Sequence, residues 1–139
     1  MRSITVRSIL AAAAAAIFLC GGAQFSAQAQ TPETTQPAVG VGVICNTPEQ
    51  AKHFVSLRAQ GDKANHAIEV INTEAKEPRA CGVAAVIYLR DAIVTTGTLG
   101  GKLVQVVRIN VVAGFNGSGW QRVGDMVQYA VIEGGGETI

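Results

Sequence analysis

The hydrophobic period of this sequence changes at Cys81, and that change limits the fold more than any other feature. Before Cys81 the apolar residues recur every three or four positions, which is the period of an amphipathic helix. After it they alternate, or run together in segments rich in valine and isoleucine, as strands do. Because helices precede a run of strands and do not alternate with them, the sequence predicts an α+β fold.

A first helix is expected directly after Cys45. Thr47 can cap it, Pro48 fits the first helical turn, and Gln50 stands three residues after Thr47, as in a capping box. The helix should run to about Ala59, and Gly61 should end it, because glycine adopts the left-handed conformation of that position at little cost.

A second helix is expected from a cap at Asp62 to about Ala75, and Pro78 closes it. The short link between the helices predicts a compact pair whose apolar sides face a sheet. The positions expected on those apolar sides are Ala51, Phe54, Val55 and the stem of Arg58 in the first helix, and Ala64, Ala67, Ile68 and Ile71 in the second.

The remaining segments predict strands joined by glycine-rich turns. Val107, Ile109 and Val111 should share one face, opposite Arg108 and Asn110, as in an antiparallel sheet with one wet side. We therefore predict a short N-terminal strand and two helices packed on a curved four- to five-stranded antiparallel sheet. The expected strands are 39–45, 83–89, 93–98, 103–112 and 126–133, with turns at 98–102 and 115–119.

The first 29 residues have the pattern of a signal peptide. Arg2 and Arg7 precede an apolar run at 9–19, and an Ala-Gln-Ala processing site ends at Ala29. Gly21 interrupts the run before the roughly 20 residues that a spanning helix needs. We expect cleavage near Ala29, a periplasmic or secreted product, and no stable membrane insertion after cleavage.

Two further regions follow that leader. Residues 30–38 are rich in threonine, glutamine and proline and predict a disordered spacer, so that 39–139 form a single domain. Without Arg2 and Arg7, nine of the eleven Lys and Arg residues remain against ten Asp and Glu, a net charge of about −1. The cations are spread singly, whereas nucleic-acid binding needs a basic patch, so no nucleic-acid partner is expected.

Cys45 and Cys81 are the two cysteines that remain after processing, and an oxidising compartment favours a disulfide between them. Two alternatives stay open. Cys45 precedes a helix, whose dipole would stabilise a thiolate nucleophile. With His53 and His66 the two cysteines could also bind zinc, although their spacing lacks the close pairs of known zinc motifs. We expect no metal, no cofactor and no catalytic residues.

An aromatic cluster is the best candidate for a binding surface. Trp120, the single tryptophan, follows a glycine-rich turn, where it can either close the core or form a platform for a ligand. The residues expected to share that surface are Tyr88, Arg108, Asn110, Phe115, Arg122, Gln128 and Tyr129.

Two resemblances accompany these patterns. In residues 44–50 (ICNTPEQ), 80–84 (ACGVA) and the strand 102–111, the chain resembles a group of small exported, uncharacterised proteins of Gram-negative bacteria. The strand half, with its Gly119-Trp120 pair, is also similar to the SH3-like barrels of bacterial envelope proteins. The first resemblance implies export, and the second implies a small curved barrel.

These observations favour a non-catalytic exported domain that binds a peptide, a glycan or a partner protein in the cell envelope. A small envelope hydrolase with Cys45 as nucleophile is one alternative. A structural or stress-related envelope protein with no defined ligand is another.

The first prediction concerns processing and oxidation. The exported protein, alkylated without reduction, should have an intact mass that begins at Gln30 and carries no alkyl group, because the leader is removed and both cysteines are bonded. Mass spectrometry reads both results at once. Two added alkyl groups would contradict the disulfide and leave Cys45 available as a nucleophile or ligand.

Overall fold

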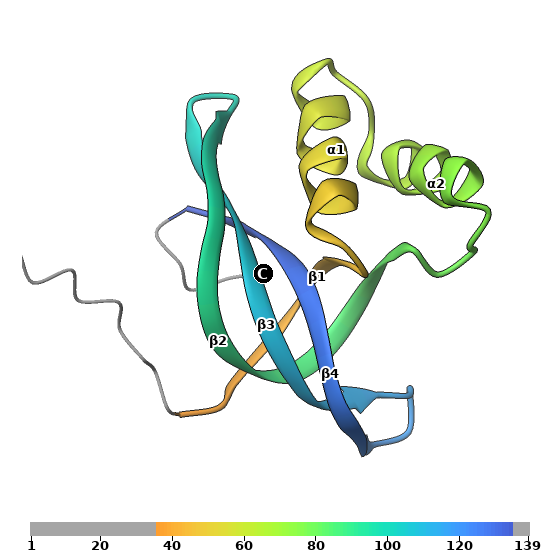
Figure 1. The fold of residues 1–139 in the computed structure, drawn as a ribbon, viewed down its shortest axis with the longest axis vertical. Helices are drawn as coiled ribbons and strands as arrows, with labels where there is room; N and C mark the ends of the chain where they lie inside the picture. Colours follow the sequence, from red (N-terminus) through yellow and green to blue (C-terminus); the bar gives the residue numbers. More distant parts are fainter. Residues whose placement is uncertain (1–35, 135–139) are drawn as a thin grey trace, which may run out of the picture.

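A computed structural model of the chain describes residues 36–134. The predicted signal peptide and most of the predicted spacer lie outside the described residues. The elements, in chain order, are β1 (Ala38–Cys45), α1 (Pro48–Ala59), α2 (Ala64–Ala75), β2 (Cys81–Leu99), β3 (Lys102–Phe115) and β4 (Trp120–Glu133) (Figure 1). The α+β class is confirmed, with two helices and a four-stranded antiparallel sheet.

Helix α1 begins and ends as its sequence predicts. The Gln50 amide donates to Thr47 Oγ1 over 3.2 Å, and the Thr47 amide donates to Gln50 Oε1 over 3.1 Å, which completes the capping box. Gly61 follows the helix at a φ of 100°, in the left-handed region that glycine enters without a steric penalty. Local sequence therefore accounts for both ends of α1.

The predicted cap of α2 is wrong by one residue. Lys63 occupies the N-cap position and makes no side-chain capping bond. Asp62 lies just outside the helix, and its Oδ1 is 3.4 Å from Nδ1 of His66, one turn further along. The carboxylate thus interacts with a side chain of the first turn and not with a backbone amide.

Asn72 joins the end of α2 to the start of β2. Its Oδ1 accepts a hydrogen bond from the Cys81 amide (2.8 Å), and its Nδ2 donates to the Cys81 and Pro78 carbonyls (3.0 Å each). These bonds satisfy backbone groups where the chain leaves the helix, and they hold Cys81 in place.

The strands predicted at 83–89 and 93–98 are one strand, β2, which continues through Asp91. The pairing of β2 with β3 shifts register between Arg90 and Ala92 and again between Ile93 and Thr95. Each shift inserts an extra residue, and such bulges bend a strand without ending it. Asp91 is the extra residue of the first bulge, where a strand-breaking side chain is tolerated.

Strand β4 begins at Trp120, six residues before the predicted start at 126. Asp125 lies inside this strand. The register between β3 and β4 jumps from Met126, opposite Val111, to Arg122, opposite Ala113. The residues between Arg122 and Met126 form a bulge, which explains how glycine and aspartate interrupt the apolar pattern without ending the strand.

The four strands close into a barrel in the order β1-β2-β3-β4. β1 pairs with β2 along its whole length, and it meets β4 through Ile44 opposite Ala130 and Cys45 opposite Tyr129. Both helices are inserted between β1 and β2 and pack on one side of the barrel (Figure 1). The SH3-like resemblance stays a prediction.

The alternation of β3 serves two hydrophobic cores. Val107, Ile109 and Val111 face the barrel interior, as predicted, whereas Val104 and Val106 face the helices. The helices therefore cover part of the outer face of the sheet. At Arg108 and Asn110 this face is exposed to solvent. The buried residues of the interior core are Ile44, Val86, Tyr88, Val107, Ile109, Val111, Ala130 and Ile132; those of the helix core are Cys45, Ala51, Phe54, Ala67, Ile71, Ala80, Cys81, Val104, Val106 and Val131.

The predicted disulfide between Cys45 and Cys81 is present. The two residues are directly opposed in the β1–β2 ladder, and their Cα atoms are 4.1 Å apart. Both are buried, at 0% and 2% exposure. The bond closes a loop, with a sequence separation of 36, that contains both helices.

Removing the disulfide should cost a large part of the stability. We expect the double variant Cys45→Ala/Cys81→Ala to lose about 4 kcal/mol of unfolding free energy, the chain-entropy value for a loop of this length. Urea unfolding followed by Trp120 fluorescence measures the loss. Reduced wild-type protein is the control and should unfold at a similarly lowered urea concentration. A loss of unfolding free energy below about 1 kcal/mol would contradict the prediction that the disulfide stabilises the fold by constraining the unfolded chain.

Candidate functional site

The register of the sheet divides the predicted binding surface between two faces. Directly opposed residues of neighbouring strands share a face, and successive residues alternate. Two of the eight predicted residues lie on the inward face and six on the outward face, because a bulge at Val112 reverses the alternation of β3 before Phe115. The inward set is Tyr88 and Gln128; the outward set is Arg108, Asn110, Phe115, Trp120, Arg122 and Tyr129.

The two inward residues lie at different depths in the barrel. Tyr88 lies opposite Val111 and is 4% exposed, so its ring belongs to the barrel core and not to a surface. Gln128, opposite Ile109, is half-buried. Phe115 and Trp120 oppose each other at the far end of the β3–β4 hairpin, on the outward face.

A polar strip beyond the helices contains three of the outward residues, Arg108, Asn110 and Tyr129. Arg108 lies opposite Tyr129, and its Nη1 is 3.2 Å from Oδ2 of Asp91. Both side chains of this ion pair are more than a third exposed, so the pair contributes little to stability. Asn110 follows on the same face.

Phe115 and Trp120 form a defined aromatic pair. Their ring centroids are 5.4 Å apart and their planes are tilted by 58°, an arrangement that aromatic rings favour over a parallel sandwich. Phe115 is 48% exposed and Trp120 is 45% exposed. Trp120 therefore does not close the core, and half of each ring remains available for contact.

The hairpin turn holds this pair in place. Asn116 Oδ1 accepts hydrogen bonds from the Ser118 and Gly119 amides, each 2.9 Å, and the Asn116 amide donates to the Gly119 carbonyl over 3.1 Å. Gly117 has a φ of 93°, which a non-glycine residue would adopt only with strain. A short, internally bonded turn thus presents the two rings.

A cationic side chain shares the face of the aromatic pair. Arg122 lies on the outward face of β4 with Trp120 and is exposed, whereas Met126, which is 44% exposed, lies beyond the bulge on the inward face. We call Phe115, Trp120 and Arg122 the aromatic end. A cluster of exposed apolar side chains at one end of a domain is typical of an interaction surface.

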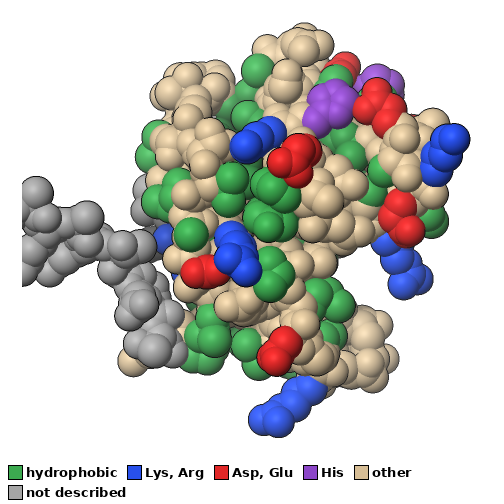
Figure 2. All heavy atoms as spheres, in the orientation of Figure 1, with side chains coloured by type: hydrophobic (Ala, Val, Ile, Leu, Met, Phe, Trp, Pro, Cys, Tyr) green, Lys and Arg blue, Asp and Glu red, His purple; other side chains and the backbone are tan. Residues whose placement is uncertain are grey.

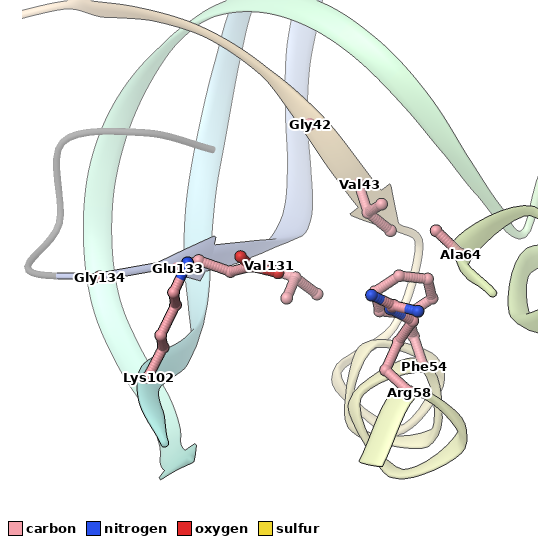
Figure 3. Close-up of a pocket in the computed structure, with 9 residues that line it drawn as sticks. All are labelled: Gly42, Val43, Phe54, Arg58, Ala64, Lys102, Val131, Glu133 and Gly134. Carbon is pink, nitrogen blue, oxygen red and sulfur yellow. The ribbon is translucent and has the colours of Figure 1, made fainter. Parts of the chain in front are cut away.

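A second feature, not expected from the sequence, lies where β1 and β4 separate. A cavity of about 480 Å³ opens there, beneath α1. We call it the seam groove. It is lined by Gly42 and Val43 of β1, Phe54 and Arg58 of α1, Ala64 of α2, Lys102 of β3, Val131 and Glu133 of β4, and Gly134 (Figure 3). No pattern in the sequence pairs Val43 with Val131, because only closure of the barrel brings them together.

The residues considered as a nucleophile or as zinc ligands lie outside both the aromatic end and the seam groove. Cys45 is fully buried and bonded to Cys81, so its sulfur is not a free thiol. His53 Nδ1 lies 3.3 Å from Glu74 Oε2, and His66 contacts Asp62, both on the helical layer beside acidic side chains (Figure 2). Within residues 36–134, no cluster of three or more potential metal ligands is found.

Arg90 is an inward charge that the sequence pattern could have revealed. It lies opposite Ile109 on the interior face, in phase with Val86 and Tyr88. Two of its guanidinium nitrogens, Nε and Nη2, are buried without a hydrogen-bond partner in the described part of the chain. Such a group lowers stability.

Comparison with protein-family models, curated proteins and solved structures finds no match to this chain. Among the helices between residues 36 and 134, none combines the length and apolar character needed to cross a membrane.

Asn116 should control how firmly the aromatic pair is held. Asn116→Ala removes the acceptor for two backbone amides and should lower the unfolding free energy by about 1 kcal/mol. Urea unfolding measures the change. Ser118→Ala is the matched control, because only the Ser118 backbone takes part in these bonds, and it should leave stability unchanged. Equal losses in the two variants would contradict the role of Asn116.

Proposed function

We propose that the chain is a non-catalytic exported domain that binds a partner polypeptide in the cell envelope through its aromatic end. The observation that carries this proposal is the half-exposed Phe115–Trp120 pair on an internally bonded hairpin. Rings held in one arrangement lose little conformational entropy when a partner covers them. Exposed apolar side chains gathered at one end support a binding role over a purely structural one.

The exposed area of the Phe115 and Trp120 rings is large enough to support measurable binding affinity. Fully burying an aromatic side chain removes roughly 150 to 250 Å² from water, so covering the exposed half of both rings would remove roughly 200 Å². At about 25 cal/mol per Å² this is about 5 kcal/mol, before the costs of association. The aromatic end is thus a candidate for the central contact of a moderate interface.

A polypeptide fits this end better than a glycan does. Sugars stack on flat aromatic faces, whereas the planes of Phe115 and Trp120 meet at 58° and offer no common flat surface. Arg122 adds a cation of the kind enriched at protein interfaces.

Two further parts of the proposal, export and the lack of a catalytic role, are supported by the disulfide. The disulfide supports export, because such bonds persist in oxidising compartments. It also weighs against the alternative of a hydrolase that uses Cys45, since a nucleophile must be a free and accessible thiol. That alternative would need reduction of the bond and exposure of a side chain that is fully buried.

The test is recovery of a partner from envelope extract with the tagged mature domain. Trp120→Ala should abolish recovery of a specific protein and weaken its measured affinity at least about tenfold, which corresponds to 1.4 kcal/mol. Met126→Ala is the matched control, because Met126 is 44% exposed on the opposite face of the same hairpin, and it should retain binding. An unchanged profile for Trp120→Ala rejects the aromatic end, and capture of a glycan alone rejects the polypeptide class.

A further inference from the structure

Among residues 36–134, the closure of the barrel leaves two strand edges without sheet partners. β1 and β4 pair at Ile44 opposite Ala130 and at Cys45 opposite Tyr129. Beyond these pairs the described strands separate, and no ladder is recorded between residues 38–43 and 131–133. Each strand is bonded along its other edge, β1 to β2 and β4 to β3. The backbone groups that face the seam are therefore unpaired within the sheet.

The seam groove occupies the start of this opening. Its floor is apolar, with Val43, Phe54 and Val131, and its volume of about 480 Å³ is sufficient for several side chains. Figure 3 shows Phe54 and Arg58 on one side of the opening and Val131, Glu133 and Lys102 on the other. Free strand edges thus lie next to a hydrophobic cavity.

Charged side chains stand at the rim of this cavity. Arg58 and Lys102 supply two positive charges and Glu133 one negative charge. Within the described residues neither cation forms an ion pair with Glu133. The same three side chains also line the adjoining hollow beside the β2–β3 turn, so the positive excess continues along one path.

We propose that the seam groove binds an extended polypeptide segment carrying a carboxylate side chain, which adds as a further strand along the free edge of β4. Strand edges offer N–H and C=O groups at the spacing of another extended backbone, a pattern that sugars and lipids do not match. Alternate side chains of the added strand enter the apolar cavity. The carboxylate lies between Arg58 and Lys102, whose combined charge exceeds that of Glu133.

This site is separate from the aromatic end. The groove lies where β1 separates from β4 beside α1, whereas Phe115 and Trp120 lie at the β3–β4 turn. A partner that contacts one site need not contact the other, so each proposal stands or fails alone.

The test is an NMR titration of the oxidised domain with a blocked hexapeptide in which valine and glutamate alternate. We expect the largest shifts at the amides of residues 42–43 and 131–134. The same peptide with alternate backbone nitrogens methylated keeps its side chains but loses donors along one edge, and it should bind at least tenfold more weakly. Absence of shifts at these amides up to millimolar peptide, or equal binding of the methylated peptide, would overturn strand addition.

The charge requirement is tested with matched variants. Lys102→Glu reverses the net charge at the rim and should weaken binding of the glutamate peptide at least fivefold, while it strengthens binding of a valine-lysine peptide. Lys52→Glu makes the same change on an exposed position of α1 outside the groove and should leave the affinity unaltered. Equal effects of the two substitutions would sink the assignment of the carboxylate to this rim. Trp120→Ala should leave these titrations unchanged, which separates this site from the aromatic end.

Discussion

The disulfide between Cys45 and Cys81 joins the two layers of this protein at one point. It links directly opposed residues of β1 and β2, between which both helices are inserted. Pairing of two strands that are separated by 35 residues is unfavourable, because closing the intervening loop costs conformational entropy. The bond removes most of that cost and keeps the helix core, to which both cysteines belong, in contact with the sheet.

Strand β3 contributes side chains to both hydrophobic cores. Residues facing inward fill the barrel, and residues facing outward pack against α1 and α2 near the start of the strand. The helices cover only that part of the outer face. The rest of the strand carries Arg108 and Asn110 into solvent and leads to the turn that presents the aromatic pair. One alternation pattern therefore determines where the protein is packed and where it is free to interact.

The two proposed binding sites arise from different properties of the sheet. The aromatic end depends on a tight turn, whose Asn116 and Gly117 fix the rings by local bonding. The seam groove depends on the twist of the strands, which lets β1 approach β4 at one corner and then separates them. Sequence patterns indicated the first site, because aromatic residues flank a recognisable turn. They could not indicate the second, which joins residues about 90 positions apart.

By itself the sequence determined the local structure: the capping box of α1, the apolar sides of both helices, the disulfide partners and the inward face of β3. Each depends on neighbouring residues or on a single available pairing. Only the tertiary structure decided that Asp91 lies in a bulge, that Tyr88 is buried, and that β1 meets β4 at one corner. Those outcomes depend on register and closure, which distant strands set together through burial, and no local pattern carries that information.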